Sequence, residues 1–258
     1  MMKRFIAAIA IFILLAVPGA AHAATHAAAA VSDGLKIDFS GGGLFTDRMM
    51  QIVALITILS VAPSILIMMT SFVRIVVVLS LLRTALGLQQ SPPNSVIVSL
   101  ALFLTLFVMT PTLKDAYAQG IQPLVANQIT TEQAFDKTTA PLKKFMLGHV
   151  READLKLFMD MAGTKKLPAP EAVALTTLAP AFMLSELKRA FEIGFLIFVP
   201  FLIIDMAVAS ILMSMGMMML PPVIISLPFK LIFFVLVDGW RLISGSLVES
   251  YMHGPPPG

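Results

Sequence analysis

Four ionisable residues lie inside otherwise apolar segments of this 258-residue chain: Arg74, Asp205, Lys230 and Asp238. A charge surrounded by lipid costs about 3 kcal/mol on insertion scales, so such residues normally face a charged partner or a water-filled path. The chemistry open to them is therefore ion pairing in a protein interior or catalysis by carboxylates.

The two aspartates are placed symmetrically about a pair of prolines. Asp205 precedes Pro221 by sixteen residues, and Asp238 follows Pro222 by sixteen. If both segments are helical, each carboxylate lies about 24 Å from the prolines at 1.5 Å rise per residue, so the two share one depth. Two facing aspartates can share a proton and activate water, as an aspartyl protease does.

Ion pairing is nevertheless the interpretation that the sequence favours for both aspartates. Arg241 follows Asp238 by three residues, a spacing at which side chains on a helix meet. Lys230 or Arg74 is available to Asp205, and no Gly-x-Gly-Asp motif accompanies the second aspartate. We therefore predict structural ion pairs and no catalytic residue, with an intramembrane aspartyl protease using both aspartates as the alternative.

Other kinds of site find little support in the sequence. The chain has no cysteine, which excludes disulfides and thiolate metal sites, and no second His or Cys stands near His149. No Ser/His/Asp set, His-Glu-x-x-His motif or Walker motif is present. Net charge is only +3 without a basic stripe, so nucleic-acid binding is not expected. We expect no metal and no cofactor.

Five methionines gather in residues 213–219, whose sequence is MSMGMMM. Thioether side chains are apolar and adapt to irregular shapes, and Gly216 allows the chain to leave helical geometry there. The cluster is either packing at a helix tip or a compliant seal in a pore. The residue types alone favour packing.

Composition places the chain in or against a membrane. Hydrophobic residues make up 58% of it, charged residues only 13%, and mean hydropathy is +0.91. An ordinary soluble domain carries about 25% charged residues. A chain with so many apolar residues needs lipid or partner subunits to cover its surface.

The N-terminus has the pattern of a secretory signal peptide over residues 1–23. Lys3-Arg4 is followed by an apolar run at 5–17, a Pro-Gly break, and an Ala-x-Ala cleavage site formed by Ala21 and Ala23. The alternative is an uncleaved anchor, although the run is short for a span. Residues 24–44, ending in three glycines, are predicted to be a flexible lead.

Two helical hairpins are predicted from long apolar segments. The first hairpin, 45–113, has segments at 49–82 and 95–113, and the second, 191–250, has segments at 194–220 and 223–243. Turn residues separate the two segments of each hairpin. These turn residues are Pro92, Pro93 and Asn94 in the first hairpin, and Pro221 and Pro222 in the second.

A polar insert at 114–190 separates the hairpins and carries most of the charge. Leu142, Phe145, Met146 and His149 form a helical apolar stripe after Pro141. The predicted fold is therefore all-α and membrane-associated, with two long helical hairpins flanking a helical polar insert. A tail rich in glycine and proline, 251–258, has no assigned role.

Topology follows if each apolar segment spans the membrane once. A cleaved signal places the mature N-terminus outside, and four spans then return the insert and the C-terminus to that side. The hairpin tips carry almost no charge, although conventional spans are usually anchored by inner Lys and Arg. We therefore expect the tips to pack against protein.

Long strings in the chain resemble the signatures of the FliP family. They cover about 45–247 and leave the Gly/Pro tail as a departure. The first signature corresponds to FVRIVVVL at 72–79, LRTALG at 82–87 and PPN at 92–94. The approach to the second is PAF at 180–182 with SELK at 185–188. The second corresponds to PFLIID at 200–205, MGMMM at 215–219, ISLPFK at 225–230 and VDGW at 237–240.

The resemblance implies a pore-forming core subunit of the flagellar type III protein export gate, which conducts unfolded flagellar subunits and is not an enzyme. It implies a pentameric ring of this subunit, completed by FliR and FliQ and associated with FlhB and FlhA, in the inner membrane at the flagellar basal body, with the polar insert periplasmic. The family's methionine gasket corresponds to Met217, Met218 and Met219, which makes the seal the favoured interpretation.

Two further alternatives remain beside the flagellar gate and the protease. The equivalent subunit of a virulence-type secretion injectisome shares both signatures, although the signal peptide and DGWRLI at 238–243 with GSL at 245–247 favour the flagellar branch. A small-solute transporter would show repeat-related broken helices, and the two hairpins do not match each other in motif.

Overall fold

The computed structural model describes residues 67–163, 173–217 and 221–252, together with isolated positions between 49 and 60. The chain divides into two compact units, Met1–Ile65 and Leu66–Gly258, and helices α4 to α11 belong to the second. Several expectations lie outside the described residues. These are the signal peptide with Ala21 and Ala23, the lead at 24–44, Met218 and Met219, and residues 253–258 of the tail.

Helices α4 (Phe72–Ala85) and α5 (Asn94–Ala116) contact each other and are joined by a proline-rich turn. Arg83, in the last turn of α4, donates from Nη1 to Asn94 Oδ1 at 2.6 Å and to the carbonyl oxygen of Pro92 at 3.3 Å. Pro93 is extended and precedes the first residue of α5. The two hydrogen bonds from Arg83 thus hold the turn, and its prolines keep α4 and α5 from forming one continuous helix.

The helix that begins with α5 is longer than the sequence indicated. It passes the expected end at 113 and continues through π-helix η1 (Tyr117–Ile121) and helix α6 (Gln122–Val125). The helical stretch ends where Asn127 adopts a left-handed conformation with φ of 55°, a common way for a helix to stop. The start of the polar insert is therefore an extension of an apolar helix.

Helix α7 (Thr131–His149) begins with a capping box, in which the side chains of Thr130 and Gln133 each bond the other's backbone N–H. Pro141 was expected to open this helix, but it lies inside it because the capping box provides an earlier start. Leu142, Met146 and His149 are buried on one face, as their spacing predicts.

Helix α8 (Glu152–Met161) follows after a short connection and buries Leu155 and Met159. Both belong to a hydrophobic cluster that also contains Met146 of α7 and Phe182 of α9. The insert is therefore anchored to the longest helix by apolar packing.

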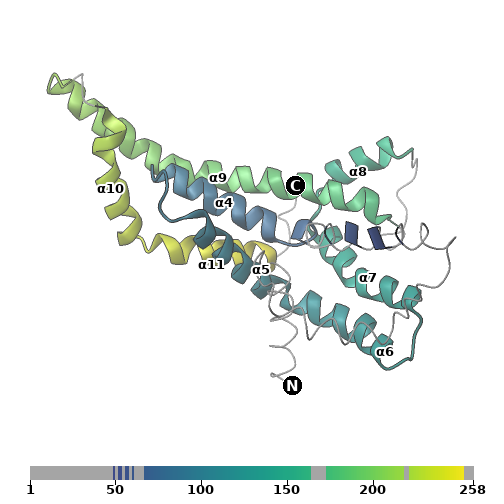
Figure 1. Cartoon of the computed structure of the whole chain (residues 1–258). Coiled ribbons are helices and arrows are strands. Elements are labelled where there is room, and N and C mark those ends of the chain that lie inside the picture. The colour runs from purple at the N-terminus through teal and green to yellow at the C-terminus, as the bar shows by residue number, and fades with distance from the viewer. Residues whose placement is uncertain are drawn as a thin grey trace. The chain divides into compact units, whose positions relative to one another are not determined.

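Helix α9 (Leu175–Ser214) is continuous through Pro180 and Pro200 and is the longest element among the described residues. The sequence placed a boundary between insert and hairpin near 190, but no break occurs there. Figure 1 shows α4 lying along α9, and the approach is close: a Cβ on Gly194 would lie 2.3 Å from Leu81 Cδ1. The glycine thus permits two apolar helices to pack at short range.

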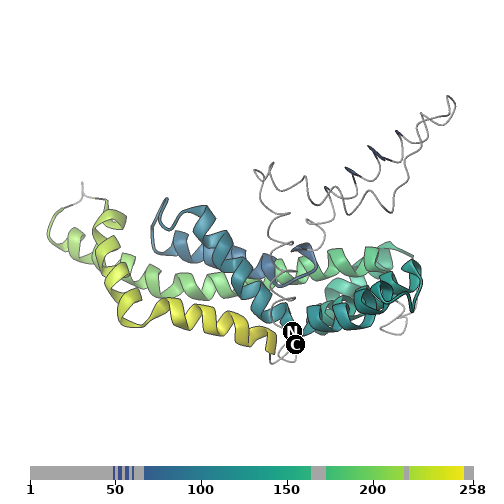
Figure 2. The same ribbon diagram turned by 60° about the horizontal axis from the view of Figure 1, so that its bottom comes forward.

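The prediction of one helix across 223–243 was wrong. Helix α10 (Pro222–Leu236) ends, and α11 (Gly239–Met252) starts after a bend of 61° (Figure 2). Asp238 lies at the bend with a φ of 51°, a conformation that aspartate tolerates better than most residues. A Cβ on Gly239 would lie 2.1 Å from Phe234 Cε2, so the bend packs the chain directly against this ring.

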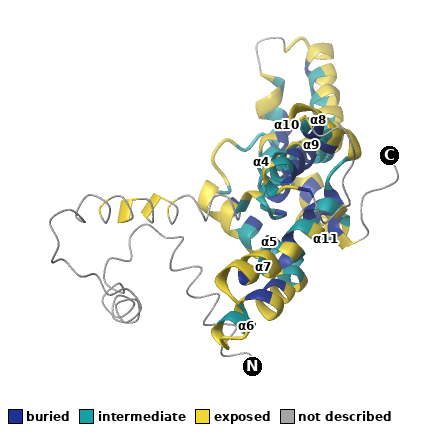
Figure 3. Ribbon diagram, turned by 90° about the vertical axis from the view of Figure 1, so that its right-hand side faces the viewer, coloured by how far each residue is buried: buried dark blue, intermediate teal, exposed yellow. Residues whose placement is uncertain are grey.

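The core of this unit lies where α4 meets α9, α5 and α11. Buried residues of α4 contribute to two of three hydrophobic clusters, and the third joins the insert to α9. Figure 3 shows that α10 carries many exposed residues, whereas α6 carries both exposed and intermediate ones. The largest apolar cluster contains Ile75, Val78, Leu79, Ile97, Ala101, Ala190, Leu247 and Tyr251.

Two described helical stretches are long and apolar enough to cross a membrane, Asn94–Val125 and Leu175–Ser214. The bent pair of α10 and α11 makes a third if it is counted as one span. Only small shares of the two apolar windows, 22% and 11%, are buried within the chain. Lipid or protein partners therefore have to cover the remainder.

Candidate functional site

The first polar cluster joins α9, α10 and the end of α4. Lys230 Nζ lies 2.7 Å from Asp205 Oδ2 and 3.4 Å from the carbonyl oxygen of Ala85. The hydroxyl of Ser226 donates to the other carboxylate oxygen of Asp205. Asp205 of α9 thus bonds two residues of α10, Ser226 and Lys230. Lys230 also contacts the last residue of α4, so the cation links three helices.

Burial is unequal in this ion pair. The side chain of Lys230 is 4% exposed, whereas that of Asp205 is 25% exposed. A buried ammonium depends strongly on its counter-ion, while a partly exposed carboxylate retains access to solvent or to a partner. Loss of the carboxylate should therefore destabilise the chain more than loss of the lysine.

Asp238 and Arg241 form a separate, exposed contact at the bend between α10 and α11. Arg241 Nη1 lies 4.0 Å from Asp238 Oδ2, and the side chains are 87% and 65% exposed, respectively. Such a pair contributes little to stability. Because α10 ends at Leu236, the premise that placed Asp238 and Asp205 at one depth, a straight helix from 222 to 238, does not hold.

The second polar cluster surrounds Arg74, which is 1% exposed on α4. Its Nη2 pairs with Glu186 of α9, and its Nη1 donates to Ser250 Oγ at 3.1 Å. The guanidinium carbon lies 3.9 Å from the ring centroid of Tyr251, whose hydroxyl donates to the other oxygen of Glu186. Both carboxylate oxygens are thereby used, and α4, α9 and α11 are linked.

Sequence reasoning did not single out Glu186 or Tyr251 as site residues. The signal for Glu186 was its helical spacing: it shares a face with Phe182 and Ala190, both fully buried, so it was bound to point into the core. No comparable signal marks Tyr251, because it lies beyond the last apolar segment and its partners are far away in sequence.

The methionine tip is described only in part. Helix α9 ends at Ser214, Gly216 adopts a φ of 75°, and Met213, Met215 and Met217 are exposed. After the tip, Pro221 precedes α10 and Pro222 is its first residue. The described methionines therefore present their side chains outward at the end of a long helix.

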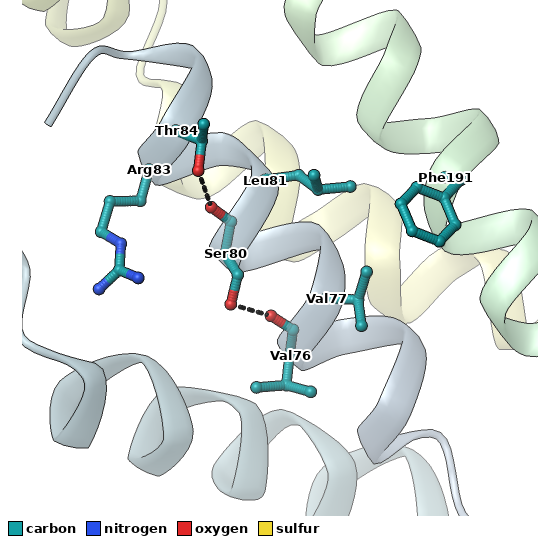
Figure 4. A pocket seen from close by; sticks show the side chains of 7 residues that line it. All are labelled: Val76, Val77, Ser80, Leu81, Arg83, Thr84 and Phe191. Carbon is teal, nitrogen blue, oxygen red and sulfur yellow. Dashed lines mark hydrogen bonds between the residues drawn. The ribbon is translucent and has the colours of Figure 1, made fainter. Parts of the chain in front are cut away.

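A shallow groove runs along α4 beside Phe191 of α9, as Figure 4 shows. Its hydroxyls are used internally: Ser80 Oγ donates to the carbonyl oxygen of Val76, and Thr84 Oγ1 donates to that of Ser80. The groove thus offers mainly apolar surface. Among the described residues, no group of three or more His, Cys, Asp or Glu side chains is arranged to hold a metal ion.

Comparison with known proteins gives matches over most of the chain. A profile of the FliP family matches residues 55–247. Flagellar biosynthetic protein FliP of Caulobacter vibrioides is 60% identical over 231 residues, which are 88% of this chain and 86% of that protein. The protein of the same name from Bacillus subtilis is 56% identical over 201 residues, 78% of this chain and 91% of that protein.

A third protein of that name, from Agrobacterium fabrum, is 48% identical over 252 residues, which are 97% of this chain and 100% of that protein. The segment matched by the family profile contains Arg74, Glu186, Asp205 and Lys230, as well as the methionine tip. Tyr251 lies just beyond it.

Proposed function

Because the chain belongs to the FliP family, we propose that it is a pore-forming core subunit of the flagellar type III protein export gate and conducts unfolded flagellar subunits. The observation that carries the proposal is the match of the family profile to residues 55–247, across both polar clusters and the methionine tip. The relatives' shared name, flagellar biosynthetic protein, favours the flagellar machine over the injectisome.

The proposed assembly is a pentameric ring of this subunit in the bacterial inner membrane, together with FliQ, FliR, FlhB and FlhA, with the insert on the periplasmic side. Extensive exposed apolar surface on α9 and α10 supports burial between subunits, because soluble monomers rarely expose large apolar patches. Strongly exposed residues of these helices include Phe195, Leu196, Ile203, Met206, Ile224, Val235 and Leu236.

Met217, Met218 and Met219 are proposed to form the gasket that closes the pore. Two features support this role: the positive φ of Gly216 breaks the helix before them, and Met217 is exposed. Flexible thioethers can close around an unfolded chain without offering it a charge. In the alternative, the methionines merely pack at the tip of the helix.

An intramembrane aspartyl protease is not favoured. Each aspartate has its own cation, Lys230 for Asp205 and Arg241 for Asp238. A protease dyad needs two carboxylates close enough to share a proton, whereas Asp205 already bonds Lys230 and Ser226. We therefore propose a non-enzymatic role for both residues.

The proposal is tested by deleting the gene and scoring flagellation, then restoring it with Met217, Met218 and Met219 changed to alanine. We expect deletion to abolish flagella, and the alanine variant to assemble gates that leak small ions. A matched control changes three exposed methionines outside α9 and α10, Met68, Met161 and Met252, to alanine; these cells should remain tight. Normal flagella after deletion would reject the flagellar role, and a tight alanine variant would reject the gasket.

A further inference from the structure

His149 is the last residue of α7 and is 8% exposed. Its Nδ1 lies 2.8 Å from the carbonyl oxygen of Phe145, one turn earlier in the same helix. Its Nε2 lies 3.3 Å from the carbonyl oxygen of Tyr251 on α11, 102 positions away in the sequence. The imidazole therefore bridges the polar insert and the C-terminal helix.

Both acceptors around this imidazole are of a kind that cannot donate. A carbonyl oxygen only accepts, and a neutral imidazole carries one N–H, so in the neutral form one ring nitrogen presents a lone pair to an oxygen. A doubly protonated imidazole donates from both nitrogens, and charge-assisted hydrogen bonds are the stronger ones. The geometry at His149 thus matches the protonated ring better than the neutral one.

The surroundings of the ring also suit a positive charge. His149 ends a helix of 19 residues, and the unpaired carbonyls of a helix C-terminus favour a cation. The rings of Phe145 and Tyr251 lie with centroids 4.5 Å and 5.2 Å from that of the imidazole. Aromatic neighbours at such distances can attract a cation.

Charged groups on the neighbouring elements are largely compensated. Glu186 pairs with Arg74, and Asp154 lies 3.7 Å from Arg151. Charged and titratable groups on the elements that pack near the ring include Arg74, Glu186, Arg189, Tyr251, Arg151, Asp154 and Glu249.

We propose that His149 is a proton-operated clasp between α7 and α11, closed when the imidazole is protonated and loosened when it is neutral. Histidine is the side chain whose ordinary charge change falls between about pH 5 and 8. Lower pH therefore fastens the insert to the C-terminal helix, and higher pH releases it. The clasp is separate from the methionine tip, so the test of the gasket does not decide whether the clasp exists.

The test is backbone hydrogen exchange of the full chain in detergent at about pH 5.5 and about pH 8, the range in which histidine titrates, corrected for the chemical exchange rate. We expect amides at the end of α11 to be protected roughly tenfold more at the lower pH, since a charge-assisted bond is gained there. In His149→Gln, whose amide donates identically at both pH values, the ratio should fall to about one.

The matched control is the double variant His26→Gln/His253→Gln, which should keep the pH contrast of the parent chain. A His149→Gln variant that also keeps this contrast would overturn the proposal, and so would greater protection of α11 at the higher pH. If His149→Gln fails to fold, nitrogen-15 NMR of labelled histidine in the parent chain decides, because a neutral imidazole at about pH 5.5 contradicts the clasp.

Discussion

The guanidinium of Arg74 and the carboxylate of Glu186 form an ion pair that is almost completely withdrawn from solvent, with side chains 1% and 0% exposed. The pair joins α4 to α9, and Tyr251 of α11 completes it from the other side. An arginine inside an apolar segment is thereby neutralised within one subunit. Arg74, whose charge is unusual in an apolar segment, thus helps to link three helices of the core.

Replacing Glu186 with glutamine should destabilise the chain severely. The guanidinium of Arg74 would be left buried without a counter-ion, a loss of about 3–5 kcal/mol in the free energy of unfolding. Denaturant unfolding in detergent, followed by the fluorescence of Trp240, the single tryptophan, measures this change.

The matched variant for this test is Arg74→Met/Glu186→Gln, which removes both charges and leaves an amide oxygen for the tyrosine hydroxyl. It should be more stable than Glu186→Gln alone, because no uncompensated charge is then buried. A double variant less stable than the single one would show that the pair has another role than charge neutralisation.

The pair of Asp205 and Lys230 should respond unequally to removal of either partner. Asp205→Asn leaves an ammonium that is only 4% exposed without its carboxylate, and we expect a loss of about 3 kcal/mol in the free energy of unfolding. Lys230→Met leaves a carboxylate that is 25% exposed and still bonded to Ser226, so a loss of about 1 kcal/mol is expected.

The same unfolding measurement compares the two variants directly. Equal losses, or a greater loss in Lys230→Met, would contradict the asymmetry. Proteolytic activity in membranes that contain the parent chain, abolished by Asp205→Asn without loss of assembly, would instead support the protease alternative.

The bend between α10 and α11 predicts opposite effects for two glycines of the same helix. Gly239→Ala places a methyl group about 2 Å from the ring of Phe234, and overpacking of this kind typically lowers stability by about 1–3 kcal/mol. Gly245→Ala meets no atom within 4 Å and should raise stability by about 0.5–1 kcal/mol, since alanine favours a helix interior.

Both glycine variants are compared with the parent chain by thermal unfolding in detergent. The prediction fails if Gly239→Ala is as stable as Gly245→Ala. That result would mean that the bend opens without loss of packing at Phe234.

The sequence predicts element type better than element ends here. All described elements of the second unit are helical, and the apolar stripe through Leu142 and Met146 is buried as its spacing requires. Helix ends were misplaced where tertiary contacts override local signals. Pro141 lies inside a helix that a capping box starts earlier, and the chain bends at Asp238 inside a long, mainly apolar segment.

The sequence identifies the two buried cations of the site, but it does not identify the acid that pairs with Arg74. Arg74 and Lys230 stand out because a charge in an apolar run needs a counter-ion. The carboxylate that serves Arg74 is 112 residues away, and no local pattern states which distant acid will meet it. Glu186 differs from its exposed neighbour Glu192 only by the helical face on which it lies.

The order in which a ribosome delivers these segments gives the Arg74 cluster a further meaning. Arg74 is synthesised 112 residues before Glu186 and 176 residues before Ser250. During translation its guanidinium therefore waits in an apolar segment without its own acid, where a charge is expensive in lipid. The core around Arg74 can therefore be completed only after α9 and α11 have both been made.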